Sequence, residues 1–94
     1  FRAVYRATPV LRTKRSGMAR NAAVALGNIG QDRDFPALVA ALREHDEPLV
    51  RGHAAWALGH RFGNAARGEL DRAWRGDPEL AVRSESDRAL ARLT

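Results

Sequence analysis

Apolar residues recur along this chain at the three- and four-residue spacing of amphipathic helices. The first such stretch begins at Ser16 or Gly17 and ends at about Asn28, and Gly30 stands where a terminating residue is expected. Its apolar stripe consists of Met18, Ala22, Ala25, Leu26 and Ile29. We therefore predict one helix over residues 16–28 that buries this stripe.

Polar residues and prolines mark the starts of four further helices. An Asp or Asn side chain can accept hydrogen bonds from the free amides of a first turn, and proline is tolerated there because it lacks the amide hydrogen. The start signals are Asp34 with Pro36, Asp46 with Pro48, Asn64, and Asp77 with Pro78. The predicted buried faces are Phe35, Leu38, Val39 and Leu42; Leu49, Val50, Ala54, Ala57 and Leu58; Leu70 and Trp74; and Val82, Ala89, Leu90 and Leu93. Residues 1–7 favour a short leading helix.

The helical pattern repeats every 32 residues. Residues 19–27 read ARNAAVALG, residues 51–59 read RGHAAWALG, and residues 83–91 read RSESDRALA. Alanines let a partner helix approach closely, as in an α-solenoid, where each helical pair buries its apolar face against the next. We predict an all-α solenoid of about two and a half antiparallel helical pairs, stacked with a right-handed sense. Polar residues 86–88 replace small or apolar ones, which suits an end cap.

Composition narrows the class of protein without naming a reaction. The chain has 94 residues, enough for one domain or part of a longer protein, and alanine supplies 18 of them, which favours helix. It contains no cysteine, so these residues cannot form a disulfide, ligate an iron–sulfur cluster or build a cysteine-based zinc site. No uncharged run approaches the roughly 18 apolar residues of a membrane span, so we expect no membrane partner.

Few side chains suggest a chemical site. His53 and His60 are seven residues apart, not the four that chelate a metal on a helix, so we expect no metal ligands. No serine lies in the sequence context of an activated nucleophile. Tyr5, Trp56 and Trp74 could stack on nucleic-acid bases, but both tryptophans fall on or near apolar stripes and are predicted core residues.

Positive charge is concentrated in the first fifth of the chain. Residues 1–20 carry six basic residues and no acid, whereas residues 21–94 carry ten basic and eleven acidic residues. Cations at a helix start oppose the helix dipole, so something else must stabilise them there. One reading is a phosphate-binding surface; the other is a solvated loop, or a surface that neutralises an acidic neighbouring domain. We divide the chain into a basic segment, residues 1–15, and a repeat domain, residues 16–94.

The segments TPVLRTKRSGMARNAAVALGNIG (8–30), PALVAAL (36–42) and HDEPLVRGHAAWALG (45–59) resemble the C-terminal HEAT-like domain of epoxyqueuosine reductase. The resemblance covers residues 8–60 well and the rest loosely. It implies a cytoplasmic parent enzyme, an oxidoreductase that completes queuosine synthesis by reducing an epoxide on the wobble base of tRNA. It also implies that N-terminal catalytic domains hold cobalamin and two [4Fe–4S] clusters, while the HEAT-like part holds the tRNA anticodon stem-loop.

Carried over by position, the resemblance implies RNA-binding residues but no catalytic residue. The set is Arg12, Lys14, Arg15, Arg20, Asn21, Asn28, Arg51 and His53. Asn28 could instead satisfy the end of its own helix, and Asn21 could bind buried backbone. Because the cysteine motifs are absent, the chain alone cannot be the reductase. Two functions remain open: the tRNA-binding domain of an epoxyqueuosine reductase, and a protein-binding HEAT-like scaffold.

Overall fold

The helical stretches alternate with short polar turns, and the chain folds accordingly. The computed structural model describes residues 16–93. Its elements are α3 (Ser16–Ile29), the 3₁₀ turn η1 (Asp32–Asp34), α4 (Phe35–Glu44), α5 (Pro48–Phe62), the 3₁₀ turn η2 (Gly63–Ala66), α6 (Arg67–Gly76) and α7 (Leu80–Ala91). No strand occurs within residues 16–93, and the predicted all-α fold with five main helices is confirmed. The leading helix expected at residues 1–7 and the basic segment lie outside this range.

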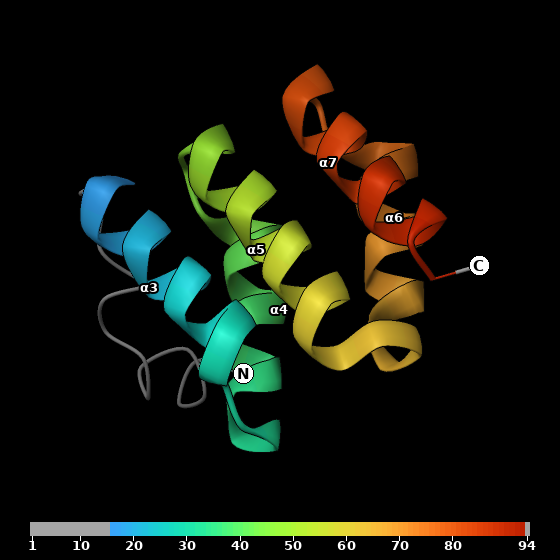
Figure 1. Cartoon of the computed structure of the whole chain (residues 1–94). Coiled ribbons are helices and arrows are strands. Elements are labelled where there is room, and N and C mark those ends of the chain that lie inside the picture. The colour runs from blue at the N-terminus through green and yellow to red at the C-terminus, as the bar shows by residue number, and fades with distance from the viewer. Residues whose placement is uncertain (1–15, 94) are drawn as a thin grey trace.

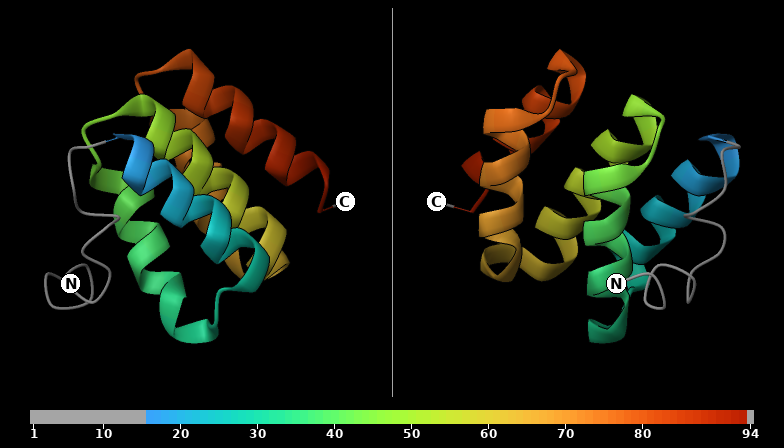
Figure 2. Two further views of the ribbon diagram at one scale, coloured as in Figure 1. Left: turned by 60° about the vertical axis from the view of Figure 1, so that its left-hand side comes forward. Right: turned by 180° about the vertical axis from the view of Figure 1, so that it is seen from behind.

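The helices form two layers. α3, α5 and α7 lie side by side in one layer, and α4 and α6 lie behind them (Figure 1), as the two turned views in Figure 2 also show. α4 packs along α5, and α6 packs along α7. In the predicted 32-residue units, each helix of the first layer pairs with the helix that follows it, α3 with α4 and α5 with α6. The structure instead favours the partner joined by a three-residue turn, residues 45–47 or 77–79, because so short a connection holds two antiparallel helices together.

The core lies between the two layers. Its large, fully buried side chains are Leu38, Leu42, Val50, Leu58, Leu70 and Val82. All six occupy predicted core positions, so the helical register of α4 to α7 is largely confirmed. Leu49 is an exception, since 48% of it is exposed.

The predicted buried stripe of α3 is only partly confirmed. Ala22 and Leu26 are half-buried and pack against the core. Met18 and Ile29 are 45% and 79% exposed, whereas Ala19 and Ala23 are fully buried. α3 packs its small residues against α5, and it has no second neighbour in its layer among the described helices. An apolar stripe is buried only where a neighbour covers it, so α3 exposes residues that the other helices of its layer bury.

Trp74 is also misassigned by the sequence pattern. It was predicted to lie in the core, but 42% of it is exposed. It lies on α6, the last helix of the second layer, and its ring packs beside the guanidinium of Arg75, 5.5 Å from the ring centroid. The periodicity placed Trp74 on the correct helix, but no further helix of the described chain covers it.

The four predicted helix caps take other roles. Asp77 lies two residues before the capping position of α7, which belongs to Glu79. The Asp34 carboxylate accepts from the backbone N–H of Gln31, 2.8 Å away, and not from the first turn of α4. The Asn64 amide oxygen accepts from the Arg67 guanidinium, 2.8 Å away. At the start of α5 the capping position belongs to Glu47 and not to Asp46. The prolines were the better signal, since α4 and α5 each carry one in the first turn.

Candidate RNA-binding surface

The predicted RNA-binding residues that the structure describes come from two neighbouring helices. Arg20, Asn21 and Asn28 belong to α3, while Arg51 and His53 belong to α5. Arg12, Lys14 and Arg15 precede the described residues. The 32-residue repeat places Asn21 and His53 at equivalent positions on α3 and α5. The structure therefore brings part of the predicted set to one face of the first helical layer.

A shallow, mainly apolar groove of about 370 Å³ crosses this face. Val24 of α3 contributes one side and Glu85 of α7 the other, and Gly52, His53 and Trp56 of α5 also line it. A methyl group added at Gly52 would meet nothing within 4 Å, so the missing side chain leaves real space there. The groove joins three helices that are 32 residues apart, and sequence periodicity alone did not predict it.

Two aromatic rings extend along α5 from this groove. The rings of Trp56 and His60 are stacked, with centroids 4.8 Å apart and an interplanar angle of 12°. Trp56 was predicted to be a core residue, and it is only half-buried, packing against the core while lining the groove. The signal that could have placed it is the repeat register, which aligns Trp56 with the exposed residues Val24 and Arg88.

The polar residues of the face differ in how their hydrogen bonds are used. Asn28 donates from Nδ2 to the carbonyl oxygen of Val24, 3.2 Å away, so it bonds within its own helix. The Nδ1 atom of His53 lies 2.8 Å from the carbonyl oxygen of Leu49. Asn21 is exposed, and Arg20 is half-buried and forms no ion pair with another described residue. Arg20, Asn21 and His53 are thus the predicted residues best placed to meet a ligand.

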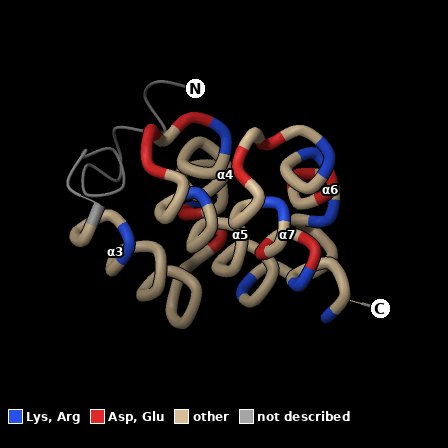
Figure 3. The backbone as a smooth tube through the Cα atoms, turned by 90° about the horizontal axis from the view of Figure 1, so that it is seen from above, with Lys and Arg blue, Asp and Glu red and all other residues tan. Residues whose placement is uncertain are grey.

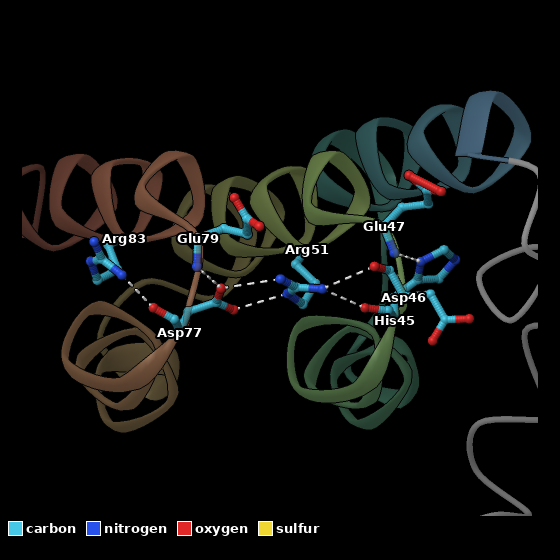
Figure 4. Close-up of polar contacts among 7 residues, drawn as sticks. All are labelled: His45, Asp46, Glu47, Arg51, Asp77, Glu79 and Arg83. Carbon is cyan, nitrogen blue, oxygen red and sulfur yellow. Dashed lines mark hydrogen bonds and ion pairs between the residues drawn. The ribbon is translucent and has the colours of Figure 1, made fainter.

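Arg51 is different, because its guanidinium joins two hairpins inside the protein (Figure 4). Its Nε and Nη2 atoms donate to the two carboxylate oxygens of Asp77 at 2.9 and 3.2 Å. Its Nη1 atom donates to the carbonyl oxygens of His45 and Asp46 at 2.7 and 3.3 Å. The side chain is only 11% exposed. The bidentate pair and the two carbonyl contacts use the guanidinium donors within the protein, so Arg51 has a structural role, and its contact with RNA stays a prediction.

Charge over the described residues is balanced. Residues 16–93 contain equal numbers of basic and acidic residues, whose positions along the backbone are coloured in Figure 3, and the net charge of +5 therefore arises from residues 1–15. The hydrogen bond from Arg43 lowers the pKa of the Glu69 carboxyl below its ordinary value, and Arg72 adds to this effect. The acids and bases of the second layer neutralise one another, so the excess positive charge of the chain lies in the basic segment.

Two other kinds of site were sought among residues 16–93. No group of three or more His, Asp or Glu side chains is arranged to hold a metal ion there. In the same range, no helix combines the length and the apolar character needed to cross a membrane.

Comparison with known proteins gives three informative similarities. The profile of HEAT repeats matches residues 2–59 and again residues 35–94. The chain is 30% identical to the epoxyqueuosine reductases of Bacillus anthracis and Bacillus cereus over 76 residues, which is 81% of this chain and 20% of each relative. It is 32% identical over 66 residues to an uncharacterized protein from the gldA 3′ region of Geobacillus stearothermophilus, covering 70% of this chain and 31% of that protein. No solved structure gives a significant match.

The second profile match, residues 35–94, coincides with the α4–α5 and α6–α7 hairpins of the structure. The chain spans about a fifth of the length of the epoxyqueuosine reductases that it matches. The two-layered stack of hairpins, the 32-residue repeat and the profile matches agree, and this chain belongs to the HEAT-repeat family, as a HEAT-like domain related to epoxyqueuosine reductase.

Proposed function

We propose that this chain is the tRNA-binding HEAT-like domain of an epoxyqueuosine reductase and that it positions the anticodon stem-loop for reduction of the wobble-base epoxide. The observation that carries the proposal is the similarity to epoxyqueuosine reductases over 81% of the chain. The parent protein would be a cytoplasmic oxidoreductase, and the reaction itself would belong to domains outside these 94 residues. This chain would supply binding and orientation only.

The charge distribution supports an RNA partner. Residues 1–15 carry five basic residues and no acid, and they lead directly into α3. Arg12, Lys14 and Arg15 would contact phosphates, because electrostatic attraction to the backbone supplies much of the affinity of such complexes. Arg20 continues the basic run into the first turns of α3.

The face of the first layer supports a second kind of contact. Asn21 and His53 are equivalent in the repeat and lie on neighbouring helices, and His53 lines the groove with Trp56. Amide and imidazole groups can recognise sugar hydroxyls and base edges of RNA, which phosphate contacts do not distinguish. Phosphate contacts would therefore hold the stem-loop, while Asn21 and His53 would set its register.

The cofactors of the proposed parent do not fit this chain. Iron–sulfur clusters are held by cysteine thiolates, and these 94 residues contain no cysteine. The two [4Fe–4S] clusters and the cobalamin would be bound by N-terminal catalytic domains of the same parent protein. No step of the reaction is assigned to residues of this chain.

The test is a titration of an anticodon stem-loop RNA followed by fluorescence anisotropy. One variant combines Arg12→Ala, Lys14→Ala and Arg15→Ala. The matched control combines Arg33→Ala, Arg67→Ala and Arg72→Ala, three exposed residues of η1 and α6 that lie outside the α3–α5–α7 layer. We expect only the first variant to weaken binding and to reduce the slope of log K against log salt by roughly 2 to 3, because each phosphate contact contributes about 0.7–0.9.

A second variant separates positioning from charge. Asn21→Ala with His53→Ala should weaken binding several-fold and leave the salt slope unchanged, since neither residue is expected to contact phosphate. Circular dichroism would verify that all three variants keep the parent's helical content. If the basic-segment variant and its charge-matched control weaken binding equally, only the global charge matters and the localised surface is wrong. If neither of these two variants weakens binding, the RNA-binding proposal fails.

A protein-binding scaffold is the second candidate, and the groove favours it. Its lining is mainly apolar, and Leu49 at its edge is 48% exposed. Apolar grooves on helical solenoids suit amphipathic protein segments. In the titration above, a scaffold would bind the stem-loop weakly and would not distinguish the basic-segment variant from its charge-matched control.

A further inference from the structure

Helix α3 exposes apolar residues whose equivalents are buried on the other two helices of its layer. We define the α3 stripe as Met18, Ala22, Ala25, Leu26 and Ile29. Met18 is 45% exposed, whereas its equivalents one and two repeats later, Val50 and Val82, are fully buried. Ala25 is exposed as well, and its equivalents Ala57 and Ala89 are fully buried. Ile29 ends the stripe and is 79% exposed, like the exposed Arg61 at its position in α5. The Met18 and Ala25 positions are therefore covered in α5 and α7, and no described helix covers them in α3.

Small residues of the preceding helix cover this side in α5 and α7. Gly27 of α3 approaches α5 so closely that an added Cβ would lie 3.1 Å from the Cα of Ala57 and would collide with the Trp56 ring. Gly59 of α5 approaches α7 in the same way, and an added Cβ would lie 2.8 Å from the Cβ of Ala89. The interface thus has two complementary sides: apolar residues on one helix, and two small residues four positions apart on the helix before it, Ala23 and Gly27 of α3 or Ala55 and Gly59 of α5.

The opposite end of the layer does not offer the complementary side. Ala23 on α3 and Ala55 on α5 are fully buried against the next helix, but the equivalent residue of α7 is Asp87, which is exposed. If α7 of a second copy packed on the α3 stripe, the Asp87 carboxylate would be buried against apolar side chains, which is unfavourable without a cationic partner. Head-to-tail stacking of identical chains is therefore disfavoured, and the α3 end differs from the α7 end.

We propose that the α3 stripe is a docking surface for one further helix of the HEAT type, from a polypeptide segment outside these 94 residues, that carries alanine or glycine at two positions four residues apart. Two interfaces of the same molecule, α3–α5 and α5–α7, support this, because they bury the residues equivalent to Met18 and Ala25. It does not depend on RNA binding, because the stripe is formed by residues other than Arg20, Asn21 and His53.

The experiment supplies such a helix as a defined probe. A copy of residues 1–32 is joined before Phe1, so the 32-residue period is kept and the added helix presents copies of Ala19, Ala23 and Gly27. We expect the extended chain to unfold in one transition with a Tm at least about 4 °C above that of the parent. A copy of residues 63–94 joined after Thr94 is the length-matched control, and we expect no rise in Tm because its added helix would face Asp87.

Two substitutions identify the surface involved. Met18→Gln with Ile29→Gln should leave the Tm of the parent within about 2 °C, because both side chains are already exposed, and should remove most of the gain in the extended chain. Val50→Gln in the parent is the positive control, and it should lower the Tm strongly because Val50 is fully buried. The proposal is supported only if the double substitution matters in the extended chain and not in the parent.

Three outcomes would overturn the proposal. If Met18→Gln with Ile29→Gln lowers the Tm of the parent as much as Val50→Gln does, the stripe is already covered within the chain. If the extended chain gains no stability, or keeps its gain after the double substitution, the stripe does not receive a helix. If sedimentation shows that the parent dimerises and that Ile29→Gln abolishes the dimer, the occupant is a second copy and not a further HEAT-type helix.

Discussion

The junction between α3 and α5 and the junction between α5 and α7 share one steric solution and differ in their polar links. Each has a glycine at the closest approach, Gly27 in the first and Gly59 in the second. In the first junction, Arg61 donates to the carbonyl oxygen of Gly30 at the end of α3. The residue 32 positions later is Leu93, so the second junction lacks this link. It has instead the bidentate pair between Arg51 and Asp77.

The turns at residues 45–47 and 77–79 show in more detail how one polar link replaces another. In both, the first residue accepts from the backbone N–H two residues later: His45 Nδ1 from Glu47 at 3.1 Å, and Asp77 Oδ1 from Glu79 at 3.0 Å. In both, its carbonyl accepts at 2.7 Å from an arginine six residues later. Asp77 also receives the Arg51 guanidinium from the preceding hairpin, and the repeat places Ala19 at the position equivalent to Arg51. The turn conformation is thus independent of the ion pair.

Small residues therefore determine how closely successive helices stack, while the polar links can be exchanged from one junction to the next. Close packing of helices needs small side chains at every junction, and no other residue type can replace them without separating the backbones. A polar link needs only that buried donors and acceptors be paired, which different residue combinations can achieve.

The largest expected effect comes from removing the carboxylate of the second junction. Asp77→Ala should lower the free energy of unfolding by about 3–5 kcal/mol, because Arg51 is left buried without its counter-ion and the Glu79 amide loses its acceptor. Urea unfolding followed by circular dichroism measures the change. His45→Ala in the first turn is the comparison, and it should cost less because Arg51 binds the backbone carbonyl of His45 and not its imidazole. Equal losses for the two variants would contradict the difference drawn between the turns.

Substitutions at the shared glycines should have the next largest effect. Gly27→Ala and Gly59→Ala should each destabilise by about 1–3 kcal/mol, because the added methyl group overlaps the next helix. Gly52→Ala is the matched control within a helix, and it should stabilise by roughly 0.5–1 kcal/mol because its methyl group enters open space. Thermal unfolding measures the change in stability for each of the three variants. If Gly27→Ala leaves the stability unchanged, Trp56 and α5 can move to accommodate the methyl group, and close packing does not define this junction.

Transplanting the ion pair into the first junction tests whether polar links are exchangeable. Ala19→Arg and His45→Asp should each destabilise the protein, since each buries a charged group without its partner. Together they should be more stable than the sum of the single effects by about 1 kcal/mol, a coupling that a double-mutant cycle measures directly. Strict additivity would mean that the first junction cannot form the Arg51–Asp77 geometry.

The smallest expected effect concerns the second layer, where Arg43 of α4 pairs with Glu69 of α6, with Nε 2.9 Å from Oε1. The Arg43 hydrogen bond lowers the pKa of Glu69, so the pair contributes stability above the unfolded pKa of roughly 4.3 and loses it as pH falls through the lower folded pKa. The Tm difference between the parent and Glu69→Gln should therefore be greatest at pH 7 and vanish toward pH 3. A difference that is constant over this range would show that the ion pair is not its source.

Much of the fold could be predicted, whereas only part of the candidate site could. Periodicity placed Leu38, Leu58 and Leu70 in the core, because these sides of α4, α5 and α6 pack within the core between the two layers. The same reasoning misplaced Trp74, which lies on α6 as Leu70 does, but on a side that no described helix covers. For the site, the repeat aligned Asn21 with His53, but it could not show that the groove beside His53 is open at Gly52.

By itself the sequence determined the all-α class, the 32-residue period and the starts of α4 and α5, because these depend on local propensity, proline placement and repetition along the chain. Only the tertiary structure decided that Arg51 binds Asp77, that Trp56 lines a groove, and that the Met18–Ile29 side of α3 is exposed. The physical reason is the same in each case. Ion pairing, exposure and close contact depend on the neighbours of a helix, and those neighbours lie 26 to 32 residues away, where local sequence patterns carry no information about distance.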